Sequence, residues 1–135
     1  AGILLDDGRA FAEFINCSLE GKDIVLHSDG SAIRTYTYTP DAINAIFMIM
    51  ERGESGCMYN VAATENLVSI RDLANLIADL SPKKTTKVVF SQEASKMPYL
   101  PFKLAIMDTS KVRELGWLPQ TGLQEMFKWT INSFL

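Results

Sequence analysis

The segment from Ser28 to Asp41 constrains the fold of this chain more than any other. Asp29-Gly30 is a strong turn signal, and residues 33–39 are rich in the β-branched and aromatic side chains typical of a strand. Thr39 followed by Pro40 predicts a helix start, with Thr39 as the N-cap and Pro40 as the first helical residue. A turn, a strand and a helix start in succession predict a place that can hold an anionic ligand.

Alternation along the predicted strand places Arg34, Tyr36 and Tyr38 on one face and positions 33, 35, 37 and 39 on the other. A guanidinium group offers a fork of donors that matches phosphate oxygens, and it stays charged at every working pH. Tyrosine rings can stack on a sugar or a base and hydrogen-bond through their hydroxyl groups. The alternative interpretation is a surface ion pair of Arg34 with Asp29 or Asp41, beside a half-buried tyrosine face.

Hydrophobic periodicity predicts a mixed α/β domain of about five helices and four short strands. The expected helices cover residues 6–20, 41–52, 69–80, 108–116 and 121–134, and the expected strands cover residues 24–26, 33–39, 57–63 and 87–90. Gly21 suits the C-terminal end of the first helix. Ser69 and Thr121 suit the N-caps of the third and the last. Residues 91–103 carry two prolines and no periodicity, which predicts a loop.

The predicted helix over residues 41–52 is apolar almost all round. A helix of this kind is buried on several sides in a folded protein. Covering it is difficult for a chain of 135 residues, so we expect another domain or a second subunit to cover part of it. If no such partner is present, the helix should leave an exposed apolar patch larger than monomers usually carry. That patch predicts association of the chain into homo-oligomers.

Composition argues against several classes of function. The formal net charge of −3 argues against a nucleic-acid partner, because phosphate backbones are bound by an excess of cations.

Cys17 and Cys57 stand far apart and His27 is the one histidine, so no metal site is expected. We interpret the cysteines as reduced thiols of a cytoplasmic protein, with a disulfide as the alternative. No window reaches the length of a membrane helix and no signal peptide is recognised, so we expect no membrane partner.

A series of short motifs runs along the chain in a fixed order. They are Ile24-Val25-Leu26, Asp29-Gly30, Arg34-x-Tyr36-x-Tyr38-Thr39-Pro40-Asp41, Tyr59-Asn60-Val61-Ala62, Ser69-Ile70, Asp108-Thr109-Ser110-Lys111, Leu115-Gly116-Trp117-Leu118-Pro119 and Thr121-Gly122-Leu123-Gln124-Glu125. Together they resemble the C-terminal, substrate-binding part of the extended short-chain dehydrogenase/reductases, the family of NAD-dependent nucleotide-sugar epimerases and dehydratases. The resemblance covers nearly the whole chain.

The resemblance implies a role for several residues. Arg34 would bind the diphosphate of a nucleotide sugar, the segment from Lys22 through Val25 to His27 would lie along the nucleotide base, and Tyr36 would help to line that pocket. Many family members have a second arginine before the Asp-x-Ser-Lys motif, and here Lys96 or Lys103 would have to take its place. We therefore expect the substrate-binding residues to be Lys22, Val25, His27, Arg34, Tyr36 and Lys103.

The resemblance also implies what the rest of the protein would contain. NAD would bind in an N-terminal Rossmann domain, where a Tyr-x-x-x-Lys pair would act as base at a sugar hydroxyl. We expect this chain to lack that domain, with its Gly-x-x-Gly-x-x-Gly turn and its catalytic pair, and therefore to contain no catalytic, cofactor-binding or metal-binding residue. Thr39-Pro40-Asp41 and Asn60-Val61-Ala62 depart from the family pattern of Val-x-Asp and Asn-Val-Gly, which allows a different substrate.

The leading hypothesis is that residues 1–135 are the nucleotide-sugar-binding portion of an NAD-dependent epimerase or dehydratase that serves surface-polysaccharide synthesis and is inactive by itself. Whether the whole protein is an epimerase, a dehydratase or a decarboxylase stays open. The alternative hypothesis is a non-catalytic module that binds a nucleotide or another protein through the face carrying Arg34.

Overall fold

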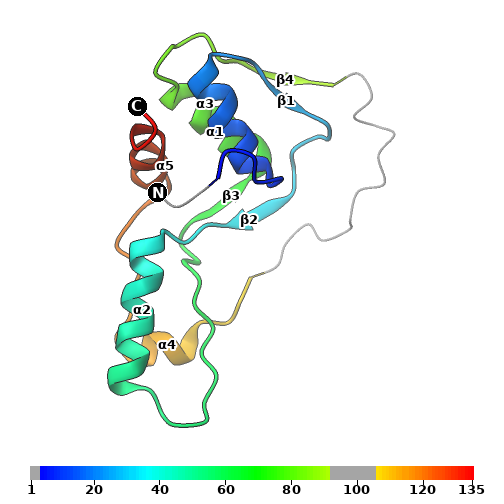
Figure 1. Cartoon of the computed structure of the whole chain (residues 1–135). Coiled ribbons are helices and arrows are strands. Elements are labelled where there is room, and N and C mark those ends of the chain that lie inside the picture. The colour runs from blue at the N-terminus through cyan, green and yellow to red at the C-terminus, as the bar shows by residue number, and fades with distance from the viewer. Residues whose placement is uncertain (1–3, 92–105) are drawn as a thin grey trace.

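A computed structural model describes residues 4–91 and 106–135 of the chain. In chain order the elements are α1 (Ala10–Glu20), β1 (Ile24–Leu26), β2 (Ile33–Thr35), α2 (Thr39–Arg52), β3 (Leu67–Ser69), α3 (Ile70–Leu80), β4 (Val88–Phe90), α4 (Ser110–Glu114) and α5 (Leu123–Asn132). The described residues thus form five helices and four short strands, and the predicted mixed α/β class is confirmed. Figure 1 shows two regions, with α1, α3, α5, β1 and β4 above, α2 and α4 below, and the pair β2–β3 near their junction.

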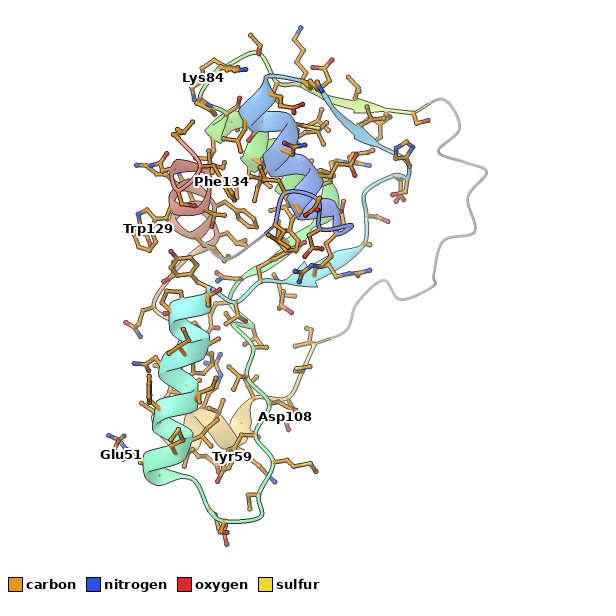
Figure 2. All side chains as sticks on the ribbon, viewed as in Figure 1. Glu51, Tyr59, Lys84, Asp108, Trp129 and Phe134 are labelled. Atoms are coloured by element: carbon orange, nitrogen blue, oxygen red, sulfur yellow. The ribbon has the colours of Figure 1, made fainter. Side chains whose placement is uncertain are left out.

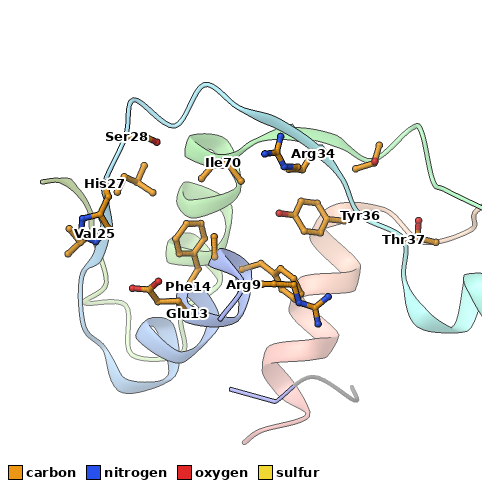
Figure 3. A pocket seen from close by; sticks show the side chains of 14 residues that line it. Arg9, Glu13, Phe14, Val25, His27, Ser28, Arg34, Tyr36, Thr37 and Ile70 are labelled. Carbon is orange, nitrogen blue, oxygen red and sulfur yellow. The ribbon is translucent and has the colours of Figure 1, made fainter. Parts of the chain in front are cut away.

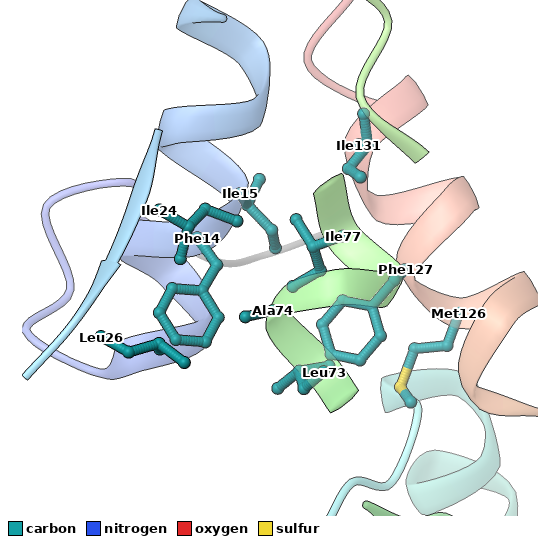
Figure 4. Packing of buried hydrophobic residues seen from close by; sticks show 10 residues of the cluster. All are labelled: Phe14, Ile15, Ile24, Leu26, Leu73, Ala74, Ile77, Met126, Phe127 and Ile131. Atoms are coloured by element: carbon teal, nitrogen blue, oxygen red, sulfur yellow. The ribbon is translucent and has the colours of Figure 1, made fainter. Parts of the chain in front are cut away.

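The larger region closes around a hydrophobic core between α1, α3, α5 and β1, and we call it the upper region (Figure 4). Its buried side chains are Phe14, Ile15, Ile24, Leu26, Leu73, Ala74, Ile77, Met126, Phe127 and Ile131. On α3 they recur at helical spacing, so one stripe of that helix faces α1 and α5. β1 pairs in parallel with β4, with Val25 opposite Val89, and Val88 of β4 packs against this core.

Local signals decide where the helices of the upper region begin and end. Gly21 follows α1 in the left-handed conformation at φ 74°, which favours glycine because a Cβ is strained there. The side chain of Ser69 accepts a hydrogen bond from the backbone N–H of Asp72 at 3.0 Å and caps α3. The positions predicted to cap α2 and α5 are shifted by one residue, since Tyr38 precedes α2 and Gly122 precedes α5.

The prediction of a strand over residues 57–63 is wrong. This segment is in no helix or strand, and its polar groups find partners elsewhere: Asn60 Nδ2 donates to the carbonyl of Asp108 at 2.9 Å, and Ala63 N donates to Thr37 Oγ1 at 2.9 Å. The strand forms instead at β3, which pairs antiparallel with β2 so that Arg34 lies opposite Val68. Strand-like composition needs a neighbouring backbone to become a strand, and β2 is adjacent to β3.

The smaller region, which we call the lower region, packs α2 against α4 around Ala45, Val112 and Trp117, all of them buried. Trp117 Nε1 donates to the carbonyl of Asp41 at 3.0 Å. One carboxylate oxygen of Asp41 accepts from the backbone N–H of Gln120 at 3.2 Å and of Thr121 at 3.0 Å. Asp41 is therefore a structural acid that ties the start of α2 to the segment leading into α5.

The opposite side of α2 is open. Ile43, Ile46, Phe47 and Met50 are 47%, 54%, 65% and 75% exposed, and their spacing of three, four and seven residues forms one stripe along the helix. We call these four side chains the α2 stripe. The prediction that α2 leaves apolar surface uncovered is thus confirmed, because the lower region covers one side of the helix and nothing described covers the other.

Two further sequence expectations concern thiols and membranes. Cys17 is half-buried and Cys57 is exposed, and both are free thiols. Burial and the nearby carboxylates raise the pKa of the Cys17 thiol. Among the described residues, no helix has the length and apolar character to cross a membrane.

Candidate functional site

A pocket of about 800 Å³ opens on the upper region between α1, β1, the turn that follows β1, and β2 (Figure 3). Its wall consists of Arg9, Ala10, Phe11, Glu13, Phe14, Val25, Leu26, His27, Ser28, Arg34, Thr35, Tyr36, Thr37 and Ile70. In Figure 3, Val25 and His27 stand on one side and Arg34 and Tyr36 on the other. Segments far apart in the sequence thus surround one space large enough for a small-molecule ligand.

Four of the residues expected to bind substrate meet at this pocket: Val25, His27, Arg34 and Tyr36. Lys22 is not in its wall, and its Nζ lies 2.6 Å from Glu20 Oε2 in a surface ion pair. That pair raises the pKa of Lys22. Lys103, the remaining expected residue, and Lys96 lie outside the described residues.

The turn between His27 and Arg34 has a defined geometry. Asp29 Oδ1 accepts hydrogen bonds from the backbone N–H of Ser31 at 2.9 Å and from its hydroxyl at 2.8 Å. Gly30 adopts φ 70°, and a Cβ there would come within 2.8 Å of the Cβ of Arg71. Arg71, from the first turn of α3, donates to the carbonyl of Asp29 through Nε at 3.1 Å and through Nη2. The two sides of the pocket are therefore joined by a braced loop.

Two guanidinium groups line the pocket. Arg34 is exposed on β2, and its Nη1 donates to the carbonyl of Ile33 at 2.8 Å. Arg9 lies over the ring of Phe11 with 5.0 Å between its Cζ and the ring centroid. Its Nε and Nη2 hold both carboxylate oxygens of Asp7 at 2.8 and 2.5 Å, which lowers the pKa of Asp7. Asp7 thus offsets part of the charge of Arg9, and both guanidinium groups can attract an anion to the pocket.

The tyrosines have different surroundings. Tyr36 packs edge-on against Phe11 and Phe127, each with 5.6 Å between ring centroids, and burial raises the pKa of its hydroxyl, so the phenol stays neutral. In Figure 3 that hydroxyl points toward the middle of the pocket. Tyr38 instead packs on Trp129 at 5.6 Å, on the side of α5 where Figure 2 shows Trp129 projecting outward.

The predicted row of Arg34, Tyr36 and Tyr38 on one face is therefore wrong. Tyr38 does not line the pocket, whereas Thr35 and Thr37, expected on the opposite face, do. The physical reason is that β2 ends at Thr35, so nothing imposes a two-residue alternation beyond it. Tyr38 instead contributes to a neighbouring cavity of about 210 Å³ that shares Arg9, Phe11, Tyr36 and Thr37 with the pocket.

Sequence reasoning missed the side of the pocket that α1 supplies, chiefly Arg9, Glu13 and Phe14. Asp6-Asp7-Gly8 is typical of a helix start, and the charged residues that follow it resemble those of any exposed helix face. No spacing in the sequence places these residues in the pocket wall, because their position there depends on how α1 packs against β1 and α3.

The expectation about the Tyr-x-x-x-Lys pair needs a correction. A Tyr-x-x-x-Lys spacing does occur, from Tyr99 to Lys103, so the expectation that the chain lacks it is wrong as to spacing. Pro101 between the two residues disfavours a helix interior, and both lie outside the described residues. No catalytic role is assigned to them.

The described residues give no site for NAD or for a metal. They contain no glycine-rich turn joining a strand to a helix, the feature that cradles a dinucleotide's pyrophosphate. Within residues 4–91 and 106–135, no three histidine, cysteine or carboxylate side chains cluster closely enough to hold a metal ion. The pocket brings together two exposed guanidinium groups, a neutral phenol, a carboxylate, an imidazole and apolar walls.

Comparison with known proteins shows which proteins the sequence and the fold of this chain are similar to. Residues 4–62 match the model of the NAD dependent epimerase/dehydratase family. The chain is 30% identical over 127 residues to a trifunctional UDP-glucose 4,6-dehydratase/UDP-4-keto-6-deoxy-D-glucose 3,5-epimerase/UDP-4-keto-L-rhamnose-reductase of Arabidopsis thaliana, which covers 92% of this chain and 18% of that protein. It is 26% identical over 127 residues to dTDP-glucose 4,6-dehydratase of Haemophilus influenzae, covering 85% of this chain and 37% of that protein.

The fold agrees with these relatives. The UDP-glucose 4-epimerase of Thermotoga maritima, solved with UDP-glucose, superposes with a TM-score of 0.77 at 26% identity, over 93% of this chain and 39% of that one. The chain thus spans well under half the length of the relatives it matches. In its sequence motifs, in the family model that matches residues 4–62 and in its fold, the chain is similar to the NAD-dependent epimerases and dehydratases among the extended short-chain dehydrogenase/reductases.

Proposed function

We propose that this chain is the nucleotide-sugar-binding portion of an NAD-dependent sugar epimerase or dehydratase. The observation that carries the proposal is the pocket of about 800 Å³ with Arg34 on one side and the β1 residues Val25 and His27 on the other. A nucleoside diphosphate has the matching character, with a flat, largely apolar base at one end and a doubly anionic group at the other.

The residues of this chain would bind and orient the substrate. Arg34 would pair with the diphosphate, because a guanidinium presents parallel N–H donors to phosphate oxygens. Val25 and Phe14 would contact the base, and the neutral hydroxyl of Tyr36 would donate one hydrogen bond to the ligand. NAD, held by a further Rossmann domain, would supply the hydride chemistry, so the chain by itself would bind without turnover.

We propose that the same Rossmann domain covers the α2 stripe. Its four exposed apolar side chains form a surface of the kind that folded proteins bury. The segment 57–63 supports the proposal, because its strand-like composition finds no partner strand among the described residues. A sheet in that domain would give the segment a partner. We further propose that the protein works in the cytoplasm, in the synthesis of surface polysaccharide.

The test is calorimetric titration of the chain with UDP-, dTDP-, GDP- and CDP-sugars, repeated with Arg34→Ala. Loss of a hydrogen-bonded charge pair to phosphate predicts about 10- to 100-fold weaker binding. Lys128→Ala on α5 is the matched control, because Lys128 is exposed and lines neither cavity. Equal loss in both variants, or no saturable binding of any nucleotide sugar by the wild-type chain, would contradict the proposal and favour a protein-interaction module.

A further inference from the structure

The pocket carries a negative side chain on one side and positive side chains on the other. Figure 3 shows Glu13 beside Phe14 on the side of Val25 and His27, away from the guanidinium groups of Arg9 and Arg34. Glu13 is exposed. It belongs to the first turn of α1, and within the described residues its carboxylate makes no hydrogen bond or ion pair. A carboxylate without such a partner in a ligand pocket has full capacity to accept hydrogen bonds.

The position of Glu13 limits how an anionic ligand can lie. A second negative charge near a carboxylate is repelled, so a diphosphate must lie on the Arg34 side. The part of the ligand next to Glu13 must then be neutral and must donate hydrogen bonds. In a nucleoside diphosphate two groups meet that description, the ribose hydroxyls and an N–H group of the base.

The surrounding side chains favour the ribose. Val25 and Phe14 offer apolar surface to a base, while a carboxylate has two acceptor oxygens that match the two neighbouring hydroxyls of a ribose. Carboxylates take this role toward ribose in other nucleotide sites. We propose that Glu13 accepts hydrogen bonds from the 2′- and 3′-hydroxyls and makes the pocket select ribonucleoside over 2′-deoxyribonucleoside diphosphates. This inference rests on the proposed function and deepens it by naming the sugar of the nucleotide.

The experiment compares UDP with 2′-deoxy-UDP, and GDP with 2′-deoxy-GDP, by calorimetry on the wild-type chain, Glu13→Ala and Glu13→Gln. A hydrogen bond to a charged group predicts that the wild-type chain prefers the ribo form by about tenfold or more. Glu13→Ala should abolish the preference by weakening the ribo form, with the deoxy form nearly unchanged. Glu13→Gln, which keeps one acceptor oxygen, should lie between them. Glu114→Ala on α4 is the control for removal of an exposed carboxylate remote from the pocket.

The inference is overturned if the wild-type chain shows no preference for the ribo form, or if Glu13→Ala keeps that preference. In the second case the change in affinity shows what Glu13 does instead. Equal weakening of the ribo and deoxy forms would mean that Glu13 faces the base, equal strengthening would mean that its charge repels the ligand, and no change would mean that it does not contact the nucleotide. If no nucleotide binds the wild-type chain, the proposed function itself fails. Circular dichroism melting of each variant confirms folding, because Glu13 is exposed and its replacement leaves no cavity.

Discussion

The two regions of the molecule differ in how completely they bury their apolar side chains. The upper region buries a continuous core between α1, α3, α5 and β1. Within residues 4–91 and 106–135, its pocket is lined by residues of this region together with β2 and the segment that follows it. The lower region has a three-residue core of Ala45, Val112 and Trp117 and leaves the α2 stripe exposed. Among the described residues, the pocket of the upper region thus has both of its sides, whereas one side of α2 has no covering element.

Trp117→Ala should have the largest effect and should be confined to the lower region. Trp117 is 1% exposed and also donates to the carbonyl of Asp41, so truncation should cost about 3–5 kcal/mol of packing. Hydrogen exchange should show protection lost in α2 and α4 and kept in α1 and α3. Leu73→Ala in the upper core is the matched case, expected to lower protection everywhere. Uniform loss in Trp117→Ala would show that the two regions unfold as one unit.

Gly30→Ala should come next, and it probes the upper region. The left-handed φ of 70° and the 2.8 Å approach to Arg71 predict a loss of about 1–3 kcal/mol. The braced loop should shift with it, so nucleotide affinity should fall several-fold in calorimetry. Gly56→Ala is the control, because Gly56 has φ 80° with no atom within 4 Å of its would-be Cβ and lies far from the pocket in sequence and fold. Equal affinity in both variants would contradict a role of the loop in binding.

Acid should weaken the lower region slightly through Glu65, which hydrogen-bonds Arg113 of α4 at 2.9 Å. Burial acts to raise the pKa of Glu65, but its hydrogen bonds to backbone, Arg113 and Thr64 together lower it. The folded pKa thus lies below the unfolded one, so the stabilisation is present above the unfolded pKa and disappears as the pH falls through the folded pKa. At 52% side-chain exposure the contribution is below about 1 kcal/mol. Denaturation at several acidic pH values should show that the free energy of unfolding depends less on pH in Glu65→Gln than in wild type. An equal pH dependence in both would contradict this role of Glu65.

Phe47→Glu on the α2 stripe should change folding stability least, within about 0.5 kcal/mol, because Phe47 is 65% exposed. Its effect should be on association. Sedimentation velocity should show the wild-type chain self-associating at high concentration and Phe47→Glu remaining monomeric. Met58→Glu replaces an exposed apolar residue outside the stripe and should leave association unchanged. A wild-type chain that stays monomeric at every concentration would contradict the interpretation of the stripe as a contact surface.

Elements whose signals lie within a few residues were predicted correctly. Gly21 ends α1, Ser69 caps α3, and β1 and β4 occupy the expected short apolar runs. Errors arose where the outcome depended on a distant partner. The strand expected over residues 57–63 has no partner among the described residues, and the strand formed at Leu67–Ser69 because β2 lies beside it. The α1 side of the pocket was missed for the same reason, since α1 joins the pocket wall by packing against β1 and α3.

Local chemistry and the fixed order of motifs along the chain predicted the family resemblance, the mixed α/β class and the uncovered apolar side of α2. They also predicted the candidate residues Val25, His27, Arg34 and Tyr36. The tertiary structure decided that Arg9 and Glu13 join those residues, that Lys22 stands apart in an ion pair with Glu20, and that Tyr38 packs on Trp129. This difference follows from the distance along the chain over which each kind of interaction acts. Caps, turns and periodicity act over a few residues, whereas a pocket is the space left when segments distant in sequence pack against one core.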